Sequence, residues 1–154
     1  MRLMRRFLML DVHLNYFEPG EFGKWWPLMC RDLLSCADRF RFLWGAPVRI
    51  SPHPDALGRE LPASKKTLHN VKKWKKVRAM DFFPEGMDTP ADMKRAFECA
   101  KMAGFSGIGL YTDTKINGKV KFMMHGDNRP DRTNFDPATW SRVNGKYLAI
   151  EEVF

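Results

Sequence analysis

Two segments of the chain carry apolar residues at helical spacing. From residue 22 to residue 44 they recur every three or four positions, which predicts one long helix or two short helices ended by Gly45. The second segment opens at Thr89, a suitable N-cap, followed by Pro90 at the first helical position, and Gly104 stops it. The pattern therefore predicts two or three helices.

Shorter segments alternate or are continuously apolar, as strands are. They are residues 7–14, 48–50, 77–80, 105–111, 120–124 and 147–150. Asn117-Gly118 is a hairpin signal between two of them. Because the helices cluster and the late strands pair locally, the predicted class is α+β, with a small antiparallel or mixed sheet flanked by two or three helices. At 154 residues we expect one domain over residues 1–154.

The segment 51–76 has no regular pattern. It contains three prolines and many polar residues, and so long an irregular stretch in a compact domain is usually functional or disordered. Its end overlaps the basic run 72–78, which contains Trp74. That run is either a solvated loop or a surface for phosphates, with the indole as a stacking platform.

The composition indicates the kind of surroundings in which the protein works, but it says little about its activity. A net charge of +8 favours anionic partners. Cys30, Cys36 and Cys99 form no CxxC pair, which indicates free thiols and argues against a metal bound by cysteine. Asp11 and His13 interrupt the apolar start and no small-residue cleavage site follows, so we expect no signal peptide. No apolar run reaches the length of a membrane span.

Two imidazoles and one carboxylate are the most informative chemistry in the sequence. His69, Asp81 and His125 each lie beside a predicted strand, with Asp81 and His125 at strand ends. Three ligands of this kind leave a fourth position open at zinc, as catalytic sites do. Each residue also has a structural interpretation, because a histidine can be satisfied at a strand end and Asp81 can cap a turn.

Four segments around these residues resemble the superfamily of zinc D-Ala-D-Ala carboxypeptidases and L-alanyl-D-glutamate endopeptidases, whose fold the small hedgehog domain shares. They are GAPVRIS, LHN with VRAMDFFPEGM, AGFSGIGLY and MMHGDNRPDR, and the match spans roughly residues 45–150. The order HN, W, VRA-D and the tail ATW, GKY are similar to phage-encoded members. The resemblance implies a hedgehog/DD-peptidase-like fold and Zn2+ bound by His69, Asp81 and His125, with VKKWKK inserted between the first two ligands.

The resemblance leaves the catalytic base open. Many members place a carboxylate three residues before the last histidine, where this chain has Phe122. Asp127 shares a strand face with His125, so it is a candidate to orient that histidine, to act as the base, or to cap the structure. Asp113, in the predicted hairpin, is a second base candidate. Arg49 and Arg59 are candidates to hold a substrate carboxylate or a developing oxyanion.

These implications favour a phage-encoded zinc metallopeptidase that cleaves peptidoglycan stem peptides, either in lysis or as a virion component that opens the wall. The alternative is a virion structural protein, in the tail or baseplate, that keeps the fold and the metal without turnover. Expected partners are the stem peptide, the anionic cell envelope and other virion proteins. A nucleic-acid-binding module would leave the two histidines and the aspartate unexplained. We expect synthesis in the host bacterial cytoplasm, followed by action on the wall or carriage in the phage particle.

Overall fold

The computed structural model describes residues 12–154, and its helices and strands follow in chain order. The helices are η1 (Pro19–Leu28, a 3-10 helix), α2 (Arg31–Trp44), α3 (Val71–Trp74), α4 (Pro90–Ala103) and η2 (Ile150–Val153, a 3-10 helix). The strands are β1 (Val48–Ile50), β2 (Ala79–Pro84), β3 (Gly107–Ile116), β4 (Lys119–Asp127), β5 (Ala138–Val143) and β6 (Lys146–Leu148). The predicted α+β class is confirmed.

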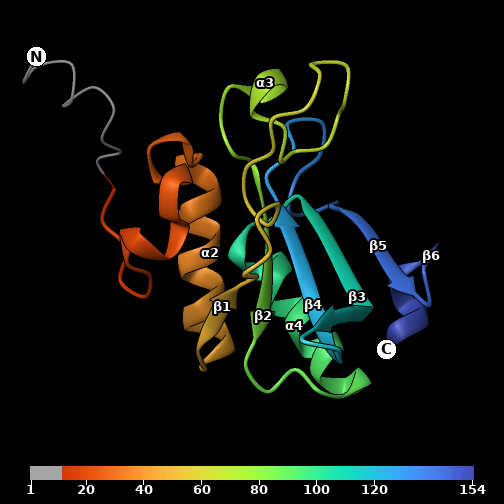
Figure 1. Cartoon of the computed structure of the whole chain (residues 1–154). Helices are drawn as coiled ribbons and strands as arrows, with labels where there is room; N and C mark the ends of the chain where they lie inside the picture. The colour runs from red at the N-terminus through yellow and green to blue at the C-terminus, as the bar shows by residue number, and fades with distance from the viewer. Residues whose placement is uncertain (1–11) are drawn as a thin grey trace, which may run out of the picture.

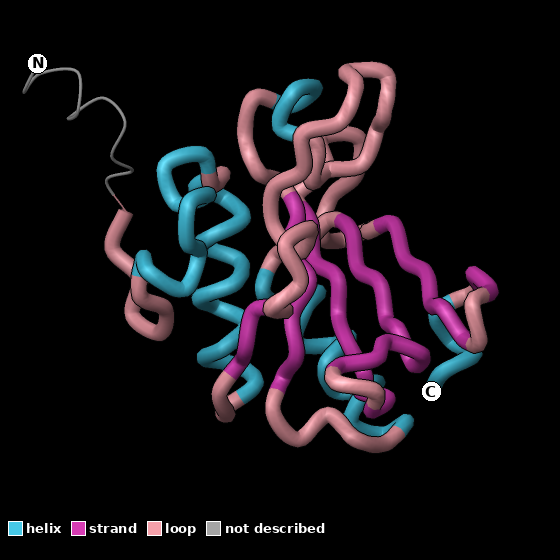
Figure 2. Tube along the Cα trace, viewed as in Figure 1, coloured by secondary structure: helices cyan, strands magenta, loops and turns pink. Residues whose placement is uncertain are grey.

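The six strands form one mixed sheet in the order β1-β2-β4-β3-β5-β6 (Figures 1 and 2). All neighbours are antiparallel except β3 and β5, which run parallel. The segment between β1 and β2, which contains α3, extends beyond one end of the sheet in both figures. The strands β4 and β3 are therefore the two central strands of the sheet, and β2 lies beside β4.

The local signals in the sequence set the ends of the elements. Gly45 ends α2 in the left-handed region, with φ of 77°, and Gly104 ends α4 in the same way, with φ of 106°. Thr89 begins α4 through a capping box with Asp92. The predicted Asn117-Gly118 turn joins β3 to β4, and both of its residues have positive φ. Of the two alternatives predicted for residues 22–44, the structure has two helices, which are η1 and α2.

One face of the sheet packs under the helices. Phe40 of α2 contacts Phe82 of β2 with ring centroids 5.2 Å apart, and Leu110 and Met124 join the same core from β3 and β4. Buried residues of α4, including Met93, belong to this core as well. The core therefore lies between the two longer helices and one face of the sheet, which leaves the other face for polar side chains.

Some boundaries differ from the prediction. The strand expected over residues 7–14 lies outside the described residues up to residue 11, and residues 12–14 are not in a strand. The segment 51–76 is mostly irregular, as predicted, but contains the single-turn helix α3. The strand β5 was not predicted, because its pairing partner β3 is distant in sequence and its own pattern is short. None of the helices described is long and apolar enough to cross a membrane.

Candidate metal centre

The strand register places Asp81 and His125 side by side. Asp81 of β2 is paired with His125 of β4, and His125 is paired with Gly109 of β3. Because side chains alternate along a strand, both point away from the face that holds Phe82 and Met124. Asp81 and His125 lie within their strands, and the prediction that they lie at strand ends is wrong. Both strands continue past these residues, because their backbone pairing with neighbouring strands extends to Phe82 in β2 and to Asp127 in β4.

His69 comes from the long segment between β1 and β2, and Asn70 holds that segment in place. The fully buried Asn70 amide accepts hydrogen bonds from two backbone N–H groups of the segment, both at 3.2 Å. It also donates to two backbone carbonyls of the segment, both at 2.9 Å. A buried amide with all these hydrogen bonds satisfied orders the backbone around it. His69 is thus presented by ordered backbone although no strand carries it.

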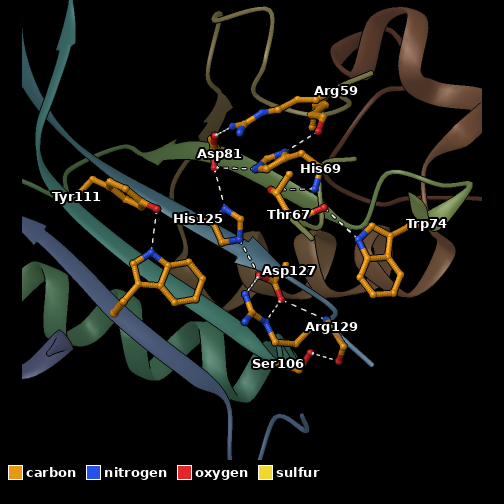
Figure 3. A network of polar contacts seen from close by, with 12 residues as sticks. Arg59, Thr67, His69, Trp74, Asp81, Ser106, Tyr111, His125, Asp127 and Arg129 are labelled. Atoms are coloured by element: carbon orange, nitrogen blue, oxygen red, sulfur yellow. Dashed lines mark hydrogen bonds and ion pairs between the residues drawn. The ribbon is translucent and has the colours of Figure 1, made fainter. Parts of the chain in front are cut away.

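The three predicted ligands form one cluster (Figure 3). One donor atom from each of His69, Asp81 and His125 lies within 4.8 Å of the others. Asp81 Oδ1 is 3.5 Å from His69 Nε2 and 3.0 Å from His125 Nδ1. Both histidines are buried and the aspartate is partly buried. The cluster is therefore close enough to bind a metal ion.

The outer nitrogen of each histidine is held by an acceptor. His69 Nδ1 lies 2.6 Å from the carbonyl oxygen of Leu57, which can only accept, so this nitrogen carries the proton. His125 Nε2 donates in the same way to the carboxylate of Asp127, at 2.7 Å. Histidines that bind metals usually donate their second N–H to a carbonyl or a carboxylate. These contacts leave His69 Nε2 and His125 Nδ1 directed toward Asp81.

The protonation states of the cluster leave a place for a cation. Burial lowers the pKa of His69, so this neutral histidine presents the lone pair of Nε2 to the Asp81 carboxylate. Burial would raise the pKa of Asp81, but the hydrogen bond from His125 holds that pKa well below its usual value. The pKa of His125 rises to about 9, because hydrogen bonds with Asp127 and Asp81 outweigh its burial. A metal ion here would replace the Nδ1 proton of His125 and separate the His69 lone pair from the carboxylate.

Asp127 is committed to His125 and Arg129. Its Oδ2 lies 2.7 Å from His125 Nε2 and 2.6 Å from Arg129 Nη2, and the residue is fully buried. Its Oδ1 accepts from the backbone N–H of Arg129 at 3.2 Å and from Nε at 2.9 Å. Burial would raise the pKa of Asp127, but these hydrogen bonds hold it well below its usual value. A carboxylate with both oxygens occupied is placed to orient His125, and poorly placed to accept a proton from a substrate.

Two glycines of β3 make room for the side chains around His125. A Cβ on Gly107 would collide with the Asp127 carboxylate, and a Cβ on Gly109 would lie 2.5 Å from Trp140 Nε1. Gly109 is paired with His125 on one side and with Trp140 on the other. The indole therefore lies across β3, with its ring centroid 5.1 Å from that of His125.

The cluster faces a cavity of about 500 Å3 that is rich in cationic and aromatic side chains. In addition to the three ligands, it is lined by Arg59, Lys66, Tyr111, Arg129, Trp140, Arg142 and Tyr147. The predicted Arg59 reaches the cluster, with Nη2 3.6 Å from Asp81 Oδ2. These surroundings favour a ligand that carries an anionic group or a carbonyl oxygen.

Asp113 and Phe122 do not face the cluster. The Asp113 carboxylate accepts from Arg142 Nε at 2.9 Å and from the backbone N–H of Gly145 at 2.6 Å. Burial would raise the pKa of Asp113, but these hydrogen bonds lower it overall. Asp113 therefore fixes the turn between β5 and β6 and is not placed as a base. Phe122 packs against the core, three residues before His125 and hence on the opposite face of β4.

Three residues that line the cavity were not among the candidates from the sequence: Tyr111, Arg129 and Trp140. Arg129 had a signal, because His125, Asp127 and Arg129 follow one another at the two-residue spacing of one strand face. Trp140 had none, because only the pairing of β5 with β3 brings it to the site.

Comparisons of the chain with protein-family models, with curated proteins and with solved structures found no match in any of the three. The chemistry of the site therefore rests on its geometry. That geometry is a buried cluster of two imidazoles and one carboxylate, beside a cation-rich cavity.

Proposed function

We propose that this chain is a phage-encoded, zinc-dependent peptidase of peptidoglycan stem peptides with the hedgehog/DD-peptidase fold. The observation that carries the proposal is the cluster of His69, Asp81 and His125, with donor atoms within 4.8 Å and both histidines anchored from outside. Two imidazoles and one carboxylate match catalytic zinc sites that keep a fourth position open. When bound, zinc supplies a Lewis acid that polarises a carbonyl and lowers the pKa of water to about 7.

The residues around the cluster have distinct parts in this proposal. The Leu57 carbonyl and the Asp127 carboxylate hold the two histidines in the orientation that ligation requires. Arg59, which lines the cavity beside Asp81, is positioned to hold a peptide carboxylate or a developing oxyanion. Stem peptides are short and carry carboxylates, so a cation-rich cavity of about 500 Å3 is consistent with this substrate class.

A second candidate is a virion structural protein that retains the metal without turnover. The observation that favours it is the lack of a free carboxylate among the described residues that line the cavity. Asp81 is a proposed ligand, and both oxygens of Asp127 are occupied by His125 and Arg129. Peptide hydrolysis needs a group that moves the proton from water to the leaving amine, and general acid–base catalysis contributes about 10²–10⁴-fold.

The deciding experiment pairs metal analysis with digestion of purified cell wall. The proposal predicts bound zinc and release of new amino groups, both abolished by a chelator and restored by zinc. His69→Ala should lose both, while His53→Ala, at an exposed histidine outside the cavity, should keep both. Protein that holds zinc but releases no amino groups from several kinds of peptidoglycan would support the structural alternative.

A further inference from the structure

Tyr111 lies at the proposed metal centre but has no part in the function described so far. It follows Gly109 by two residues in β3, so its side chain shares the face of the sheet that carries Asp81 and His125. It lines the same cavity. Figure 3 shows its hydroxyl end directed toward His125.

The hydrogen bonding of the Tyr111 hydroxyl leaves its proton available. Trp140 Nε1, which can only donate, gives a hydrogen bond to the Tyr111 oxygen at 2.8 Å. The phenol therefore acts as the acceptor in that contact, and its own O–H is directed elsewhere. Within residues 12–154, no acceptor is bonded to this O–H. The half-buried hydroxyl thus offers a donor to the cavity.

Two further features keep this donor in place and protonated. The guanidinium carbon of Arg142 lies 5.0 Å from the centroid of the Tyr111 ring, and Tyr147 packs edge-on at 6.5 Å. Burial raises the pKa of Tyr111 to about 12, even though the hydrogen bond from Trp140 acts in the opposite direction. At neutral pH the hydroxyl is therefore a fixed, uncharged donor.

We propose that Tyr111 donates a hydrogen bond to an oxygen of the ligand bound at the metal centre, and that Trp140 is the positioning residue that fixes its hydroxyl. In the peptidase this oxygen is the scissile carbonyl, on which negative charge develops, so the inference deepens the proposed function and rests on its metal site. A preorganised donor aimed at developing charge is the usual way in which enzymes stabilise such an oxygen.

The test uses the full chain loaded with cobalt(II), whose visible spectrum reports ligand binding, and acetohydroxamate as the probe with metal-binding oxygens. Tyr111→Phe should weaken acetohydroxamate binding about 10- to 100-fold, the range for a hydrogen bond to a charged group, with cobalt affinity unchanged. Trp140→Phe should weaken it less, because the hydroxyl remains but is no longer held. Tyr16→Phe is the matched control, since Tyr16 packs on Phe42 of α2, outside the cavity, and should leave binding unchanged.

The outcomes separate this inference from the peptidase function. Binding by Tyr111→Phe within twofold of the wild type would overturn the inference, and so would wild-type protein that holds cobalt without binding acetohydroxamate. Loss of cobalt itself in Tyr111→Phe would also overturn it, because Tyr111 would then support the ligands. Acetohydroxamate binding does not require turnover, so a failed wall digestion would refute the peptidase and leave the role of Tyr111 standing.

Discussion

The two faces of the central sheet come from the same strands, yet their chemistry is opposite. On one face Phe82 and Met124 are buried under the helices, and on the other Asp81 and His125 form the candidate metal centre. These residues are adjacent in sequence, and the two-residue period of a strand alone separates them. The hydrophobic pattern of the sequence therefore predicts the residues of the packed face well. The residues that meet on the other face, here called the open face, are determined by contacts between strands.

This comparison predicts that the face on which a residue lies decides what its substitution costs. A change on the packed face should lower the free energy of unfolding and leave the ligands intact in folded molecules. A change on the open face should affect metal or ligand binding more than stability. The following substitutions test that separation.

Phe82→Ala should give the largest effect. Phe82 is 1% exposed and packs edge-on against Phe40, so truncation leaves a cavity in the core. The free energy of unfolding should fall by about 3–5 kcal/mol, measured by denaturant titration. Folded protein should still bind metal through the adjacent Asp81. Loss of metal from the folded fraction would show that the two faces are not independent.

Asp127→Asn should act on the open face. The amide cannot reproduce the charged pairing with His125 and Arg129, so metal affinity should fall about 10- to 100-fold, measured by competition with a chelator. Asp113→Asn is the matched control, because Asp113 does not line the cavity, and it should leave metal affinity unchanged. If Asp127→Asn instead kept full metal affinity and lowered wall hydrolysis by about 10²–10⁴-fold, Asp127 would be the base and the positioning role would be wrong.

Replacing the exposed lysines in and just after α3 should give the smallest change in stability. Lys72, Lys75 and Lys76 are solvent-exposed, so glutamine at these positions should alter the free energy of unfolding by less than about 0.5 kcal/mol per site. Zinc should remain bound, and attachment to an anionic envelope should weaken, as measured by sedimentation with cell walls over a range of salt concentrations. Loss of zinc would reveal that these side chains support the position of His69.

Local signals in the sequence predicted the elements that depend on neighbouring residues. Thr89 begins α4 and Gly104 ends it as expected, and Asn117-Gly118 joins β3 to β4, since capping and turn formation need only a few adjacent residues. The sequence also predicted that His69, Asp81 and His125 lie together, and their donor atoms do lie within 4.8 Å of one another, because β2 and β4 are neighbouring strands.

The remaining features depend on pairing over long distances. Trp140 reaches the site only because β5 runs parallel to β3, and Gly109 provides the space for the indole. The Asp113 carboxylate is held by Arg142, which lies 29 residues further along the chain. No short pattern in the sequence specifies such contacts, so the sequence alone could not choose among the candidates for the base.

The most direct test of the central claim is the metal content of purified protein, measured by mass spectrometry beside that of His69→Ala and His53→Ala. The proposed zinc site predicts about one zinc ion per chain in the wild type and in His53→Ala, and nearly none in His69→Ala, because one of three ligands is lost. Wild-type protein without metal after incubation with zinc, or full zinc occupancy in His69→Ala, would contradict the assignment of His69, Asp81 and His125 as a metal centre.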